Sequence, residues 1–172
     1  MLHLVGSTSD AWLATALDAM DRVLVDHAHC EHKAAVTALA FVSKYPDDPR
    51  LVSTLGALAR DEAGHFARVA DLCIARGLDL GHPEKDPYVD DLLKAVRKTS
   101  VLHNRVDRLL CCALIEGRSC ERMKLLARAL LAHWHVVPAG PVTVLRVASA
   151  PYAAAWMDGQ LRLNPSFLAL AA

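Results

Sequence analysis

The chain has 172 residues, enough for one domain with a substantial core, and its 53% hydrophobic and 5% aromatic content is typical of an Ala- and Leu-rich helical protein. Its formal net charge of +0 excludes a general electrostatic attraction to nucleic acid or membranes. No apolar run reaches the roughly 18 residues of a membrane span, so no membrane partner is predicted. Five cysteines without a C-x-x-C pair, and no signal-peptide pattern, predict a reduced, cytoplasmic protein.

Proline, glycine and the apolar periodicity divide the chain into predicted helices. The stretch from Ala11 to Lys44 contains neither proline nor glycine and repeats apolar residues every three or four positions, which predicts a helix of about 50 Å. Asp48 and Pro49 form a cap and first-turn pair for the next helix, and Gly77 is suited to its end. The expected helices are residues 11–44, 49–76, 88–98 and 106–131, with a break over residues 99–104.

The composition changes near residue 133. Six prolines and glycines between residues 138 and 165 interrupt any helical period, and Asp158 is the only acid in this part of the chain. We therefore expect residues 1–132 to form a helical domain and residues 133–172 an irregular tail, with a short strand at 142–147 and a helical turn at 151–157.

Three of the long predicted helices each carry a glutamate on an otherwise apolar stripe. These are Glu31, Glu62 and Glu116, and His65 lies one turn after Glu62 on the same face. A buried carboxylate must be neutralised, paired with a cation or bound to a metal. A lone E-x-x-H is usually an exposed pair. For the three glutamates together there are two interpretations, and one is that each carboxylate is neutralised separately. The other is convergence near the helix midpoints, as in ferritin-like bundles that hold two irons; oxygen and imidazole donors suit Fe or Mn.

Other polar residues near the three glutamates can be interpreted either as part of the site or as ordinary structural residues. His27 lies one turn before Glu31 and is predicted as a neighbour of the ligands or a packed histidine, and Asp61 as an orienting acid or a solvent-facing one. Cys112 and Cys120 are predicted as small core residues rather than thiolate ligands, and Glu121 as a surface acid or a neighbour of the site. Basic residues around the predicted break are candidates for contacting RNA, or only a solvated face: Lys94, Arg97, Lys98, Arg105 and Arg108.

Three segments, at residues 26–35, 58–66 and 113–122, resemble the bacterial tRNA hydroxylase family that acts on 2-methylthio-isopentenyl-adenosine next to the anticodon. The likeness covers roughly residues 1–130. It implies a ferritin-like di-iron monooxygenase that uses O2 and an external electron donor to hydroxylate the isopentenyl group of its tRNA substrate. By matched position, it implies that Glu31, Glu62, His65 and Glu116 are iron ligands.

The resemblance ends before the fourth helix of that family, which carries a second E-x-x-H. No glutamate follows Glu121, so this chain has no such motif there, and the second of the two irons would lose its Glu and His together. One ion or none is then expected. A frameshift or a divergent replacement near residue 130 is one hypothesis for the tail. The alternative function is a non-catalytic ferritin-like metal-binding or interaction module, which could dimerise through the apolar face left by the missing helix.

Overall fold

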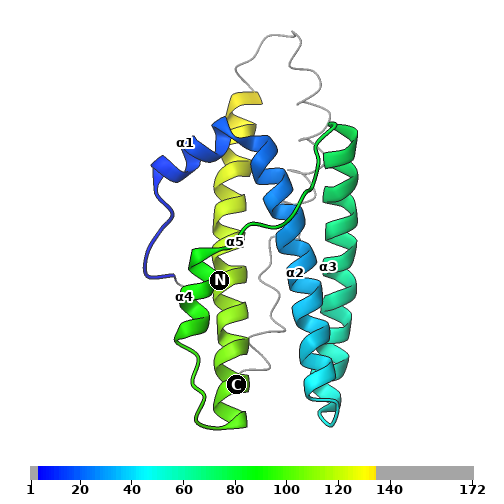
Figure 1. The fold of residues 1–172 in the computed structure, drawn as a ribbon. Coiled ribbons are helices and arrows are strands. Elements are labelled where there is room, and N and C mark those ends of the chain that lie inside the picture. Colours follow the sequence, from blue (N-terminus) through cyan, green and yellow to red (C-terminus); the bar gives the residue numbers. More distant parts are fainter. Residues whose placement is uncertain (1–3, 135–172) are drawn as a thin grey trace.

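The computed structural model describes residues 4–134, which form five helices and no strand. They are α1 (Asp10–Asp18), α2 (Met20–Lys44), α3 (Pro49–Ala75), α4 (Pro87–Lys94) and α5 (Val101–Trp134). Figure 1 shows α2, α3 and α5 as long rods running alongside one another, with the short α1 and α4 beside α5. The predicted all-α, ferritin-like bundle with three long helices is confirmed. The expected strand at 142–147 and helical turn at 151–157 lie outside the described residues.

The prediction of one helix from residue 11 to residue 44 is wrong. The backbone leaves the helical region at Ala19, with φ −123° and ψ 38°, and α2 begins at the next residue. The turn lets α1 cross toward α5, so that Ala16 becomes buried. The local sequence at Ala19 contains no proline or glycine, so we attribute the bend to tertiary packing rather than to a helix-breaking residue.

The junction between α2 and α3 is formed as predicted. Asp48 caps α3 by accepting a hydrogen bond from the backbone N–H of Leu51 at 3.0 Å, and Pro49 occupies the first turn. The turn is short, so α2 and α3 run antiparallel and pack against each other along their length. This pair is the best-packed part of the described bundle.

Two apolar clusters lie along the bundle on either side of its midpoint. The first, near the α2–α3 turn, joins α2, α3 and α5; its buried members are Ala38, Phe41, Leu51, Leu55, Leu58, Ala59, Leu109 and Ala113. The second lies toward the other end of α2 and α3; its buried members are Ala28, Val69 and Cys73. The polar residues on the stripes of α2 and α3 fall between these two clusters.

The end of α3 directs the following chain across α2. Gly77 adopts φ 70°, and hydrogen bonds run from Gly77 N–H to Ile74 O and from Leu78 N–H to Cys73 O, both 2.9 Å, as in a Schellman motif. Leu78 and Leu80 then pack on the second apolar cluster. The crossing segment, residues 77–86, is therefore held against the bundle rather than extended into solvent (Figure 1).

The last two helices differ in extent from their prediction. The helix expected at 88–98 ends at Lys94, and the one expected at 106–131 begins at Val101 and extends to Trp134. Ser100 explains the early start, because its hydroxyl accepts from the backbone N–H of His103 at 3.1 Å and its carbonyl from Asn104 at 3.0 Å. The predicted break is real but lies at residues 95–100 rather than 99–104. No described helix combines the length and apolar character of a membrane span.

An ion pair closes the connection between α4 and α5. Asp107 accepts hydrogen bonds from the backbone N–H of Arg97 at 2.9 Å and from its guanidinium at 2.8 and 2.7 Å. These hydrogen bonds lower the pKa of Asp107 from 3.8 to about 2. The carboxylate therefore stabilises the fold only while it is ionised.

We expect Asp107→Asn to lower the free energy of unfolding at neutral pH. Because the folded pKa lies below the unfolded value of 3.8, the stabilisation is complete above that value and is lost as the pH falls through about 2. Arg97 is half exposed, so added salt reduces the effect. Urea denaturation of both proteins between pH 7 and pH 2 measures this. Asp91→Asn, at an exposed pair with Lys94, is the control, and a difference that persists undiminished at pH 2 contradicts the prediction.

Candidate metal centre

The antiparallel helices α2 and α3 place the predicted ligands Glu31 and Glu62 at the same distance from the turn that joins them. Glu31 lies thirteen residues before the end of α2 at Lys44, and Glu62 lies thirteen residues after the start of α3 at Pro49. At 1.5 Å per residue, both are about 20 Å from the turn. They meet between the two apolar clusters, so apolar side chains pack above and below them along the bundle.

Glu31, Glu62 and His65 form a compact cluster. His65 Nδ1 lies 3.2 Å from Glu31 Oε2 and 3.1 Å from Glu62 Oε2, and one ligand atom from each residue lies within 4.8 Å of the others. The side chains of Glu31, Glu62 and His65 are 12%, 8% and 29% exposed. Two carboxylates and an imidazole are hard donors that suit iron or manganese, so the residues present fit one such ion.

The imidazole of His65 lies between the carboxylates of Glu31 and Glu62 and holds a proton there. Hydrogen bonds to Glu31 and Glu62 raise the pKa of His65 to about 9. Burial raises the pKa of Glu31 to about 7, whereas the pKa of Glu62 is lowered because the hydrogen bonds from His65 and Glu31 outweigh its burial. A cationic imidazole thus balances the buried carboxylates, in the position where a metal cation would otherwise do so.

His27 contacts the other oxygen of Glu31. Its Nε2 lies 3.3 Å from Glu31 Oε1, and its side chain is buried. Burial, followed by the positive charge of His65, lowers the pKa of His27 to about 4. The neutral ring therefore packs against Glu31 one turn away, which fits the predicted role of a neighbour that orients the ligand.

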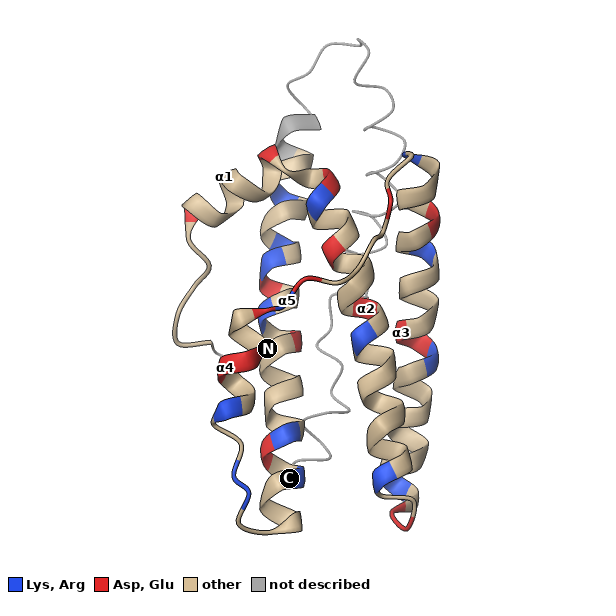
Figure 2. Cartoon of the chain, viewed as in Figure 1, with Lys and Arg blue, Asp and Glu red and all other residues tan. Residues whose placement is uncertain are grey.

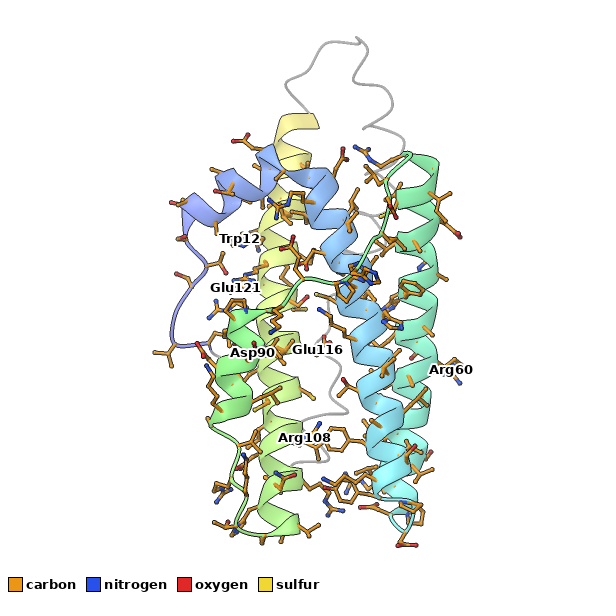
Figure 3. All side chains as sticks on the ribbon, in the orientation of Figure 1. Trp12, Arg60, Asp90, Arg108, Glu116 and Glu121 are labelled. Atoms are coloured by element: carbon orange, nitrogen blue, oxygen red, sulfur yellow. The ribbon has the colours of Figure 1, made fainter. Side chains whose placement is uncertain are left out.

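Glu116 comes from the third long helix and stands apart from the cluster. Figure 3 shows it on α5, on the side that faces α2, and its carboxylate is not part of the three-residue group. Burial and then the negative charges of Glu62 and Glu31 raise the pKa of Glu116 to about 7. The structure thus places Glu116 across from the cluster, near enough to interact electrostatically but without contact.

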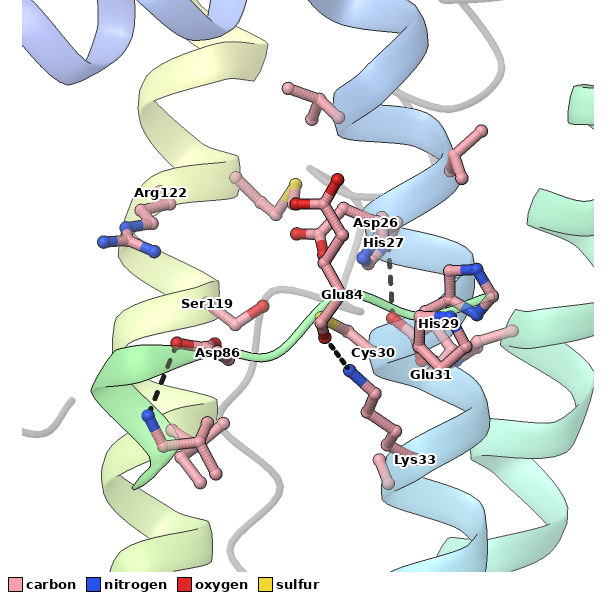
Figure 4. A pocket seen from close by; sticks show the side chains of 18 of the residues that line it. Asp26, His27, His29, Cys30, Glu31, Lys33, Glu84, Asp86, Ser119 and Arg122 are labelled. Atoms are coloured by element: carbon pink, nitrogen blue, oxygen red, sulfur yellow. Dashed lines mark hydrogen bonds and ion pairs between the residues drawn. The ribbon is translucent and has the colours of Figure 1, made fainter. Parts of the chain in front are cut away.

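A large cavity separates the cluster from α5. Its volume is about 2050 Å³, and α2, α3, the crossing segment and α5 provide its walls (Figure 4). Cys112 and Cys120 line it, and no disulfide joins the five cysteines. Burial raises the pKa of Cys112 to about 12 and raises that of Cys120, so both are thiols at neutral pH rather than thiolates. The cavity has ample room for a nucleoside-sized ligand.

Asp61 is not brought into the cluster. Its side chain is exposed and accepts hydrogen bonds of 3.3 Å from the neighbouring Arg60, and both residues are among those that line the cavity described above. The simpler of the two sequence interpretations, a solvent-facing acid, matches this position. Adjacent residues on a helix point in different directions, which explains why Glu62 is buried and Asp61 is not.

The basic residues predicted to contact RNA lie away from the cavity, and none of them lines it: Lys94, Arg97, Lys98, Arg105 and Arg108. Lys94, Arg97 and Arg105 are held in ion pairs with nearby aspartates. The guanidinium of Arg108 lies 5.4 Å from the centre of the Phe41 ring. Most of this set is therefore engaged in local structure, and its role in RNA binding stays a prediction.

The sequence did not indicate how the start of the chain attaches to α5. Glu121 accepts hydrogen bonds from the backbone N–H of Thr8 at 2.8 Å and from its hydroxyl at 2.9 Å, and it pairs with Arg118. The next residue, Arg122, lies with its guanidinium 5.0 Å from the centre of the Trp12 ring. The Arg118–Glu121 spacing was visible in the sequence, but partners more than a hundred residues away were not.

Comparison with known proteins places the chain in a family. The family model described as tRNA-(MS[2]IO[6]A)-hydroxylase (MiaE) matches residues 2–136. Two relatives are both named tRNA 2-(methylsulfanyl)-N(6)-isopentenyladenosine(37) hydroxylase. The one from Pseudomonas putida is 39% identical over 115 residues, covering 67% of this chain, and the one from Salmonella typhimurium is 30% identical over 169 residues, covering 70%. The chain spans only 56% and 62% of the lengths of these relatives.

A solved structure also resembles this chain. It is described as Protein 43 with aldehyde deformylating oxygenase activity from Synechococcus, and it is 33% identical, with a TM-score of 0.78 over 99% of this chain and 77% of that chain. The family model covers most of the chain, including the helices that carry Glu31, Glu62, His65 and Glu116. The family suggested by the sequence is thus confirmed: the chain belongs to the tRNA-(MS[2]IO[6]A)-hydroxylase (MiaE) family.

Proposed function

We propose that this chain binds iron and hydroxylates the isopentenyl group of 2-methylthio-isopentenyl-adenosine in tRNA, using O2 and an external electron donor. The observation that carries the proposal is the buried Glu31–Glu62–His65 cluster, which opens on a cavity in a chain of the MiaE family. The two relatives carry this activity in their names. A tRNA substrate also implies work in the cytoplasm.

The proposed ligands are Glu31, Glu62 and His65, with Glu116 across the cavity and His27 orienting Glu31. Iron held there would supply the O2-dependent oxidation of an unactivated C–H bond. The protein contributes the anionic donors, a cavity wall rich in apolar side chains that receives the isopentenyl group, and apolar clusters on both sides that keep water from the reacting carbon.

We infer that the three-residue cluster holds one ion more firmly than any second. A second ion would depend on Glu116 and on shared oxygens of the cluster, because no E-x-x-H follows Glu121 in the sequence. We propose that residues 1–132 are the unit that builds the site, and that residues 133–172 do not supply the family's second motif. Metal analysis of the purified chain gives the number of ions directly.

The experiment is iron analysis combined with an activity assay. The full chain is loaded with ferrous iron and given a chemical reductant, O2 and an anticodon stem-loop RNA that contains the modified adenosine. We expect at least one iron per chain and an O2-dependent gain of one oxygen atom in the nucleoside, read by mass spectrometry. An RNA with unmodified adenosine is the control.

Two results would redirect the proposal. Deformylation of an aldehyde, without oxidation of the RNA, would favour the activity named for the Synechococcus protein. Absence of both activities, with iron bound or not, would favour a non-catalytic helical module. Exposed apolar residues on α2 and α5, among them Val36, Leu39 and Leu102, are where we would look for dimerisation, by size-exclusion chromatography with light scattering.

A further inference from the structure

The walls of the cavity differ in charge. One side carries the carboxylates of Asp26, Glu84 and Asp86 (Figure 4). Basic residues of the same segments also line this side, and they are Arg22, Lys33 and Lys85. Arg118 and Arg122 on α5 give the opposite side guanidinium groups, and the basic residues along this part of α5 are visible in Figure 2. The first side is therefore mixed in charge, whereas a guanidinium group on the second side can attract a polyanion that reaches the cavity.

Arg122 has hydrogen-bonding capacity that the described residues do not use. Its Nε is buried without a hydrogen-bond partner, and no carboxylate of the described part of the chain forms an ion pair with it. The neighbouring acid, Glu121, is already engaged by Thr8 and Arg118. Leaving the Nε–H donor of an arginine unsatisfied in a buried place is unfavourable unless a ligand accepts from it.

The side chain of Arg122 is also held in place. Its guanidinium lies 5.0 Å from the centre of the Trp12 ring on α1, and both residues line the cavity. Stacking on an aromatic ring orients the planar group and reduces the entropy lost when it binds an anion. The bend at Ala19 matters here, because it is what brings α1 and Trp12 across to α5.

Arg122 lies on the same helix as Glu116 and faces the same cavity. Glu116, Ser119 and Arg122 follow one another at three-residue steps on α5, and all three line the cavity. Arg122 is six residues beyond Glu116, which corresponds to about 9 Å along the helix. A nucleotide whose modified base edge reaches the cluster would have its sugar and phosphate on the side where Arg122 lies.

We propose that Arg122, oriented by Trp12, binds a backbone phosphate next to the modified adenosine and so positions the RNA strand against α5. This inference rests on the proposed function, since it assumes a tRNA substrate. It assigns RNA positioning to the α1–α5 wall of the cavity rather than to the five basic residues near the α4–α5 connection. Arginine matches phosphate through paired N–H donors, which a lysine cannot reproduce.

The test compares binding of two ligands by the full iron-loaded chain without O2. The ligands are a modified anticodon stem-loop RNA and the free modified nucleoside, which lacks phosphates. We expect Arg122→Met to raise the Kd for the stem-loop about tenfold and to reduce the slope of log K against log salt by about one. The Kd for the nucleoside stays unchanged. Arg122→Lys, which keeps the charge, gives a smaller loss, and thermal denaturation confirms that both variants fold.

Arg128→Met is the matched control, because Arg128 is an exposed arginine on the same helix that does not line the cavity. It should leave both Kd values unchanged. The phosphate assignment is overturned if Arg122→Met weakens binding of the stem-loop and of the nucleoside equally. It is also overturned if Arg122→Met and Arg128→Met weaken binding of the stem-loop equally. If the wild-type chain binds modified and unmodified stem-loops alike and does not bind the nucleoside, the proposed function itself fails, which is a separate outcome.

Discussion

Glu62→Gln is expected to abolish firm iron binding and to lower the rate of RNA hydroxylation by at least about 100-fold. Glutamine has the same shape as glutamate but lacks the negative charge that a hard cation requires. Glu62 is also the buried acid closest to His65, at 3.1 Å, so its loss removes a ligand and the partner of a second one. Iron content by plasma mass spectrometry and single-turnover oxidation of the modified RNA measure the two effects.

The fold of this variant should survive. Removing one partner of a buried ion pair is destabilising, but Glu31 still lies 3.2 Å from His65 Nδ1, so we expect the metal-free protein to lose stability and remain folded. Asp61→Asn is the matched control, because it neutralises the adjacent carboxylate, which is exposed and paired with Arg60. Retention of wild-type iron content by Glu62→Gln, or an equal loss in Asp61→Asn, would show that the cluster is not the metal centre.

Leu55→Ala is expected to destabilise the fold by about 2–5 kcal/mol. Leu55 is fully buried in the first apolar cluster, where α3 packs against α2 and α5, and the shortened side chain leaves a space that the rigid hairpin cannot close. Chemical denaturation, followed by helical circular dichroism, gives the free energy of unfolding. Leu55 lies two turns before Glu62, so we also expect weaker retention of iron in this variant.

Leu39→Ala provides the comparison. Leu39 is on α2 near the same cluster, but it is 53% exposed, so the same truncation should change stability by no more than about 0.5 kcal/mol. Similar losses for Leu39→Ala and Leu55→Ala would mean that the face carrying Leu39 is covered, for example by a second copy of the chain. The pair of variants therefore also tests the predicted dimerisation.

The sequence was sufficient for the local features of the fold. Apolar periodicity located the long helices, and Asp48, Pro49 and Gly77 marked their ends because capping and positive φ depend on residue type at one position. It also grouped Glu31 with Glu62 and His65, since two helices joined by a short turn must run antiparallel, and residues equally far from the turn must then meet. Family membership followed from the same segments.

The remaining features required the tertiary structure. The bend at Ala19 has no local signal, because it results from packing α1 on α5. The separation of Glu116 from the cluster depends on how far α5 lies from the α2–α3 pair, which periodicity does not report. The stacking of Arg122 on Trp12 joins residues 110 positions apart. The sequence thus determined which side chains share a helix face, while the distances between helices decided which of those faces meet and which surround a cavity.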